Sequence, residues 1–264
     1  MATNIYIKLT KLFNADKLRA ILSSGQAVVL HRLAMMSKDG DWVLRADQES
    51  LTYVLGVLSE FGATYRFGAP LDLRWLSHGW SAHLEFINEG MRVRTDFVVT
   101  PPRITTAGLE RMWHEQEGAE IPFVGLRDLA DLKKTNREKD YPVIGELARR
   151  MTLPRDTFMY SRSARDLIAL ATKHPELLTP CTAERPALKE IAHGEARLAA
   201  ALDAERRDLM RVNEERLAKY LDASRPWQSA WPAIQSEIAG LPLSTAHAAL
   251  IKAAEGTLPF SPGE

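Results

Sequence analysis

Two aspartates separated by one residue are the most informative chemical feature of this sequence. Asp39 and Asp41 flank Gly40 and precede the β-prone triplet Trp42-Val43-Leu44, so a strand is expected over residues 40–45. Side chains at positions i and i+2 of a strand point to the same face, and both carboxylates can therefore contact one site. Such oxygen ligands suit Mg²⁺, which proteins commonly share with substrate phosphates. The spacing indicates a magnesium site for phosphate chemistry, although Asp-x-Asp alone is also typical of a polar loop.

A turn of small residues lies upstream of the two acids. Ser24 and Gly25 precede an apolar helical pattern over residues 26–33. Backbone N–H groups at such a turn, where a helix begins, are suited to binding an anion. We therefore expect Ser24 and Gly25 to contact a phosphate group beside the metal.

A third acid, Asp96, lies in the alternating segment 91–99 among apolar and basic residues. A carboxylate at such a position is costly to bury unless a cation or a metal ion accompanies it. Arg94, two residues earlier on the same face, is one candidate partner, and a metal ion is the other. In the second case Asp39, Asp41 and Asp96 could together hold two ions, one at the attacking hydroxyl and one at the leaving phosphates.

A basic cluster follows further along the chain. Lys133, Arg137 and Lys139 lie within seven residues of one another, across the expected end of a helix. This concentration of positive charge suits a polyphosphate, and a solvated charged face is the alternative.

Hydrophobic periodicity predicts the elements that must position these residues. Helices are expected over 15–22, 26–33 and 48–61, and then mostly antiparallel strands over 64–67, 71–76, 83–87 and 91–99, with a hairpin turn at 88–90. Beyond residue 102 the pattern is helical, over 126–134, 141–151, 164–173, 186–222 and 246–255. The segment 186–222 is expected as one long helix, as a hairpin broken near Gly194, or as an oligomer contact. The layout predicts an α+β domain over residues 1–150 and a helical C-terminal domain over residues 151–264.

Composition limits the classes of protein to consider. The chain of 264 residues has 34 Lys and Arg against 34 Asp and Glu and is 45% hydrophobic, so it should fold. Cys181 is the only cysteine, which excludes an intramolecular disulfide framework. No apolar run approaches the length of a membrane span, and residues 1–10 do not resemble a signal peptide, so a cytoplasmic location without membrane contact is expected.

The motifs described above, in their order along the chain, resemble those of a known family. Ser24-Gly25-Gln26-Ala27, then Asp39-Gly40-Asp41, then Asp96 and the basic segment 133–140 resemble the polymerase-beta-type nucleotidyltransferase superfamily. Within it, the chain is most similar to the small bacterial branch that includes antibiotic nucleotidyltransferases and abortive-infection toxins. The resemblance covers residues 14–150.

The resemblance implies a nucleotidyltransferase-like fold with a mixed or mostly antiparallel sheet and flanking helices. It also implies roles: Ser24 and Gly25 hold the triphosphate, Asp39 and Asp41 bind Mg²⁺, and Asp96 is a ligand and base. The basic residues Lys133, Arg137 and Lys139 would meet the phosphates. The implied reaction moves a nucleoside monophosphate from a nucleoside triphosphate to an acceptor, which could be RNA, a protein or a small molecule.

Two positions depart from the family pattern. Serine stands at position 24 where the family usually has glycine, and Gly40 stands between the paired acids where an apolar residue is usual. Glycine weakens a strand, which would hold the two ligands less rigidly. A second function is therefore kept open: a catalytically weak nucleotidyltransferase fold that acts as a binding module or as one half of a toxin–antitoxin pair.

The helical tail is expected to select the acceptor. Its arginines would form a wall for a phosphate-bearing acceptor such as RNA: Arg162, Arg165, Arg206, Arg207, Arg211 and Arg216. The alternative is that they pair with acids of the same helices: Asp166, Asp203, Glu205, Asp208, Glu214 and Glu215.

Overall fold

The structure, a computed structural model, describes residues 4–263, and the chain forms two compact units. The first contains Met1–Val124 and Leu217–Glu264, and the second contains Gly125–Arg216. The two units meet in the chain after Val124 and after Arg216, whereas the sequence analysis expects one boundary at residue 150. Helices just after residue 125 pack with the helices that follow them, and the C-terminal helices contribute to the core of the first unit.

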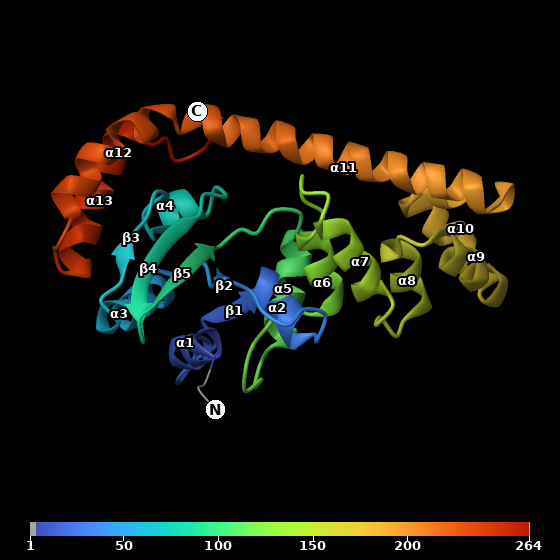
Figure 1. The fold of residues 1–264 in the computed structure, drawn as a ribbon, viewed down its shortest axis with the longest axis horizontal. Coiled ribbons are helices and arrows are strands. Elements are labelled where there is room, and N and C mark those ends of the chain that lie inside the picture. Colours follow the sequence, from blue (N-terminus) through green and yellow to red (C-terminus); the bar gives the residue numbers. More distant parts are fainter. Residues whose placement is uncertain (1–3, 264) are drawn as a thin grey trace. The chain divides into compact units, whose positions relative to one another are not determined.

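The first unit is built on one five-stranded sheet with the order β1-β2-β5-β4-β3 (Figure 1). The strands are β1 (Ala20–Ser23), β2 (Asp39–Leu44), β3 (Thr64–Tyr65), β4 (Ala82–Asn88) and β5 (Met91–Val98). Only the β2–β5 pair is parallel among these strands, and the other neighbours are antiparallel. The expected α+β class with a mixed, mostly antiparallel sheet is confirmed.

One face of this sheet is apolar and carries the core. Helices α1 (Ile5–Phe13) and α3 (Gln48–Glu60) contribute to that core, as do α12 (Arg225–Ile238) and α13 (Leu243–Thr257). The Trp42 ring stacks on Phe97 at 5.5 Å between centroids and meets the edge of Phe13 at 5.3 Å. Its indole Nε1 donates to Thr10 Oγ1 at 3.0 Å, so the one polar atom of this buried ring is satisfied. The packing fixes which side of β2 faces inward.

Two local predictions are wrong. The segment expected as a helix over 15–22 ends in strand β1, because Asn14 ends α1 and its Oδ1 accepts from the Ala20 backbone N–H at 2.9 Å. The segment expected as a strand over 71–76 contains the helix α4 (Leu73–Leu76). Asp72 caps that helix by accepting from the Arg74 N–H at 2.9 Å.

The packing around β2 explains why a glycine stands at position 40. A Cβ at this position would lie 2.4 Å from Cη2 of Trp42 and 2.5 Å from Cδ1 of Tyr6. These two rings occupy the space that a side chain would need. The glycine therefore permits close packing over β2, and it does not mark a loosened strand.

The remaining helices of the first unit are α2 (Ser24–Leu30) and α5 (Thr106–Glu115). The second unit consists of short helices followed by the long helix α11 (Glu195–Ala223), which continues into the first unit after Arg216 (Figure 1). The short ones are α6 (Leu126–Leu132), α7 (Asp140–Ala148), α8 (Pro154–Tyr160), α9 (Ala164–Lys173), α10 (Pro175–Glu184) and a 3₁₀-helix (Pro186–His193).

The segment 186–222 is interrupted at Gly194, and a break near this residue was one of the expected alternatives. This glycine adopts φ +90°, which separates the 3₁₀-helix from α11. Over the part of the chain that the structure describes, no helix is both long and apolar enough to cross a membrane.

Replacement of Gly40 by alanine should destabilise the protein by about 1–3 kcal/mol, because the methyl group overlaps the rings of Tyr6 and Trp42. Urea unfolding measures the loss. Gly56→Ala in α3 is the matched control, since no atom lies within 4 Å of a Cβ there. We expect this control to gain about 0.5–1 kcal/mol. Equal stability of Gly40→Ala and the wild type would contradict the packing argument.

Candidate active site

The register of the sheet aligns four polar residues in one row across four strands. Ser23 pairs with Asp41, Asp41 pairs with Asp96, and Asp96 pairs with His83. Residues directly opposite one another in a sheet share a face, and Asp39 lies two residues before Asp41 on that same face. The structure therefore brings Asp39, Asp41 and Asp96 to the polar face of the sheet, opposite the core.

Asp39 has an oxygen atom without a hydrogen bond. Its Oδ1 is buried and has no hydrogen-bond partner among the described residues, and Nη1 of Arg94 lies 3.7 Å away. The Asp39 side chain as a whole is 42% exposed. A carboxylate oxygen in this state suits a hard cation, because it has a lone pair available.

Asp96 is held by the imidazole of His83 and the guanidinium of Arg66. Its Oδ1 accepts hydrogen bonds from Nδ1 of His83 at 2.7 Å and from the guanidinium of Arg66. Nε of Arg66 also lies 3.5 Å from Glu85. Asp96 therefore has partners within the protein, and Arg94, the partner considered from sequence, lies nearer to Asp39.

The three acids share a face but do not form a ligand cluster. Among residues 4–263, no group of three or more acidic, His or Cys side chains is arranged to hold a metal ion. The fit to a cation rests on the carboxylate pair of Asp39 and Asp41 and on the unpartnered Oδ1 of Asp39. Asp96 as a metal ligand remains a prediction.

The turn at Ser24 and Gly25 connects β1 directly to α2. Ser24 has φ +48°, and a Cβ on Gly25 would lie 2.2 Å from Oγ of Ser37. Gln26 Nε2 donates to the backbone oxygens of Ser37 at 3.0 Å and Asp39 at 3.3 Å. These bonds attach the turn to the start of β2, beside the paired acids. Phosphate binding by Ser24 and Gly25 remains a prediction, since α2 has only seven residues.

The negative charges of Asp39 and Asp41 affect the pKa of the Tyr6 phenol. Burial raises the pKa of the Tyr6 phenol, and the negative charges of Asp39 and then Asp41 raise this pKa further. The phenol donates to the Lys38 backbone oxygen at 2.6 Å. Tyr6 therefore anchors the residue that precedes Asp39.

The predicted phosphate-binding cations belong to the second unit. Lys133 is 7% exposed, and its Nζ lies 3.4 Å from Asp140. Nε of Arg137 donates to the same carboxylate at 2.8 Å, and the Thr135 hydroxyl does so at 2.6 Å. Lys139 is exposed and immediately precedes α7. Their approach to the three acids remains a prediction, and the structure gives Lys133 and Arg137 a local partner.

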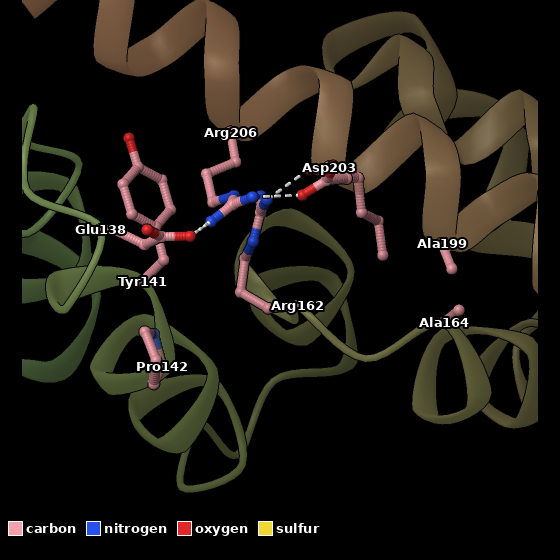
Figure 2. Close-up of a pocket in the computed structure, with 9 residues that line it drawn as sticks. Glu138, Tyr141, Pro142, Arg162, Ala164, Ala199, Asp203 and Arg206 are labelled. Carbon is pink, nitrogen blue, oxygen red and sulfur yellow. Dashed lines mark hydrogen bonds and ion pairs between the residues drawn. The ribbon is translucent and has the colours of Figure 1, made fainter.

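The arginines of the helical tail are largely paired with acids. Arg206 pairs with Glu138 and Asp203 beside a cavity of about 350 Å³ in the second unit, as Figure 2 shows. Arg162, which lines the same cavity, shares Glu205 with the buried Arg185. Ion pairs with acids are likewise found at Arg207 and Arg211. Pairing with an acid of the same helix, as the alternative had it, is found at Arg206, Arg207 and Arg211. Arg162 pairs with an acid of another element.

Sequence reasoning missed His83 and Arg66. A usable signal existed for His83. A two-residue hairpin turn at Glu89 and Gly90 pairs Asn88 with Met91, and counting back along both strands places His83 opposite Asp96. Arg66 had no comparable signal, because its contact depends on the short strand β3.

Comparisons with known proteins establish no family for this chain. No protein-family model matches the chain, and a search of curated proteins finds no relative. A solved structure described as a "putative nucleotidyltransferase from H. pylori" is similar with a TM-score of 0.38 and 10% identity, over 79% of this chain and 95% of that one. No function follows from this similarity.

Asp140→Asn should destabilise the protein by about 3–5 kcal/mol at pH 7, because it leaves the buried Lys133 without a carboxylate. Burial alone would raise the pKa of Asp140, but the Thr135 hydrogen bond and the charges of Lys133 and Arg137 lower it below the ordinary 3.8.

The carboxylate thus stabilises the fold above the unfolded pKa, and this contribution disappears as the pH falls through the lower folded pKa. The difference between wild type and variant should therefore shrink in acid, measured by thermal unfolding from pH 7 to pH 2. Glu146→Gln, an exposed acid of α7, is the control and should change stability by about 0–1 kcal/mol. A difference that stays constant over this pH range would contradict the assignment.

Proposed function

We propose that this protein is a Mg²⁺-dependent nucleotidyltransferase, which transfers a nucleoside monophosphate from a nucleoside triphosphate to an acceptor and releases pyrophosphate. The supporting observation is the acid pair Asp39 and Asp41 on β2, in register with Asp96 on β5, with a buried carboxylate oxygen that lacks a hydrogen bond. The strand-turn-helix segment through Ser24 and Gly25 borders the same acids, which matches the order of motifs in the resemblance.

Each group in the site then has a role. Asp39 and Asp41 would hold Mg²⁺, which supplies neutralisation of phosphate charge when it is bound. The backbone at Ser24 and Gly25 would contact the triphosphate, and Lys133, Arg137 and Lys139 are proposed to add positive charge at the phosphates. Asp96 accepts from the imidazole of His83, so the two can receive the proton of an attacking hydroxyl.

The acceptor class remains open among RNA, a protein and a small molecule. Pairing of the tail arginines with acids lessens their support for an RNA-binding wall, because a charge already neutralised attracts phosphate less strongly. A cytoplasmic location and a contact with a second copy of the chain belong to the proposal as well.

One observation favours the second candidate, a catalytically weak fold that acts as a binding or toxin–antitoxin module. Asp96 accepts hydrogen bonds from His83 and Arg66, and a carboxylate whose oxygen is occupied in this way is a poorer metal ligand. Gly40 no longer supports this candidate, since the rings of Tyr6 and Trp42 account for it.

Asp39→Asn and Asp41→Asn should each lower nucleotidyl transfer at least about 100-fold, because the amide replaces a charged oxygen ligand. Transfer is measured with α-³²P-labelled nucleoside triphosphates, Mg²⁺ and separate samples of total RNA and total protein. Mg²⁺ should also raise the melting temperature of the wild type more than that of either variant.

Glu60→Gln is the matched control, since Glu60 is an exposed acid at the end of α3. It should transfer label and respond to Mg²⁺ as the wild type does. Wild-type protein that binds a nucleoside triphosphate but transfers no label to any acceptor would favour the binding module instead.

A further inference from the structure

A chain of two hydrogen bonds joins Ser81, His83 and Asp96 on the polar face of the sheet. Oγ of Ser81 lies 2.9 Å from Nε2 of His83, and Nδ1 of the same ring lies 2.7 Å from Oδ1 of Asp96. A hydroxyl, an imidazole and a carboxylate connected in this order form the arrangement that activates a serine nucleophile. Strand pairing brings Asp96 to His83, and Ser81 precedes His83 by two residues.

The carboxylate determines which imidazole nitrogen carries the proton. An ionised Asp96 only accepts hydrogen bonds, so Nδ1 of His83 must be the nitrogen that donates to it. Nε2 of the neutral ring is then an acceptor, and the Ser81 hydroxyl donates to it. The geometry therefore directs the serine proton toward the imidazole.

The position of the imidazole is fixed by close backbone packing. A Cβ on Gly68 would lie 2.5 Å from Cδ2 of His83, so glycine is the residue that lets the chain pass so near to the ring. The carbonyl of Gly68 is itself held by Nε1 of Trp227 at 3.0 Å, and the Ser81 carbonyl accepts from the Ala69 N–H at 3.0 Å. The backbone that packs on the His83 ring and the backbone of Ser81 are thus both hydrogen-bonded within the first unit.

The imidazole that contacts the serine lies in the same row of the sheet as the proposed nucleotide site. His83 pairs across the sheet with Asp96, and Asp96 pairs with Asp41. Ser81 and His83 are only partly buried, so the hydroxyl can meet a bound molecule. Asp39 and Asp41 occupy the same face of the same sheet.

We propose that Ser81 is a nucleophile that accepts the nucleotidyl group, so that the protein modifies itself at this residue. The inference rests on the proposed function for its nucleotide donor. The Ser81 oxygen forms a bond to the α-phosphorus of the triphosphate, the bond from that phosphorus to the bridging oxygen breaks, and pyrophosphate leaves with the bonding electron pair. The serine proton passes to Nε2 of His83. The product is a phosphodiester between Ser81 and the nucleoside.

The first measurement is the mass of the intact chain after incubation with Mg²⁺ and each of the four ribonucleoside triphosphates. One of them should add a single nucleoside monophosphate. The tryptic peptide of residues 75–92 contains both Ser77 and Ser81, so fragmentation of this one peptide locates the group.

Three variants distinguish a chemical role of Ser81 and His83 from a purely structural one. Ser81→Ala should lose the modification, and the matched control Ser77→Ala, an exposed serine of the same peptide, should keep it. His83→Gln should slow it at least about 100-fold, as expected for loss of a general base, with little change in melting temperature. A group located on Ser77, or a His83→Gln protein modified as fast as the wild type, would overturn the proposal.

A second probe distinguishes failure of this inference from failure of the proposed function. A fluorophosphonate is a phosphorus electrophile that needs neither metal nor nucleotide, and an activated serine displaces its fluoride. We expect it to label Ser81 in the wild type and at least about 100-fold more slowly in His83→Gln.

Three further outcomes are decisive. Transfer to RNA or protein without modification or probe labelling of Ser81 overturns the inference and leaves the proposed function standing. Probe labelling of Ser81 without any nucleotidyl transfer supports the activated serine and contradicts the proposed function. Absence of both reactions overturns the two together.

Discussion

The site depends on the parallel pairing of β2 with β5. This register sets Asp41 opposite Asp96 and Trp42 opposite Phe97, so one pairing determines both the polar face and the core. Because side chains alternate along a strand, a slip by one residue would place a carboxylate against the buried aromatic rings. The cost of burying an unpaired charge therefore protects the arrangement of the acids.

The core in turn holds this register through residues that do no chemistry. Trp42 lies on the inner side of β2, one residue after Asp41, and contacts Phe97 of the neighbouring strand. Gly40, one residue before Asp41, leaves space for the rings of Tyr6 and Trp42. The inner residues that alternate with the acids thus fix the strand from the opposite side. Any change that displaces these rings is expected to move both carboxylates as well.

Much of the fold could be predicted from sequence where the pattern is local. The amphipathic helix α3, the hairpin at residues 88–90 and helix α9 were expected within a residue or two. Strand β1 was not, because its four residues are all buried and an apolar run without alternation does not distinguish a strand from a helix. Helix α4 was missed because its cap at Asp72 determines its start, and only four residues follow.

The candidate site, like the fold, could be predicted from the sequence only in part. The same-face position of Asp39 and Asp41 follows from strand geometry alone, and their position beside Asp96 required the order of strands. Trp227 and its bond to the Gly68 carbonyl were beyond prediction, since residues so distant along the chain meet only in the folded protein.

Charge is distributed unevenly over the polar face, and this unevenness bears on what the site can bind. On the β4 side, Arg66 pairs with Asp96, which also accepts a hydrogen bond from His83, and Arg66 and Arg92 pair with Glu85. On the β2 side, Arg94 reaches Asp39 only at 3.7 Å, beyond hydrogen-bonding distance, and one oxygen of Asp39 is buried without a hydrogen bond. A cation bound at this oxygen would supply the interaction that the oxygen lacks. The two sides therefore differ in what they offer to a bound molecule. The β2 side has a carboxylate oxygen without a hydrogen bond, and the β4 side has an imidazole bonded to a carboxylate.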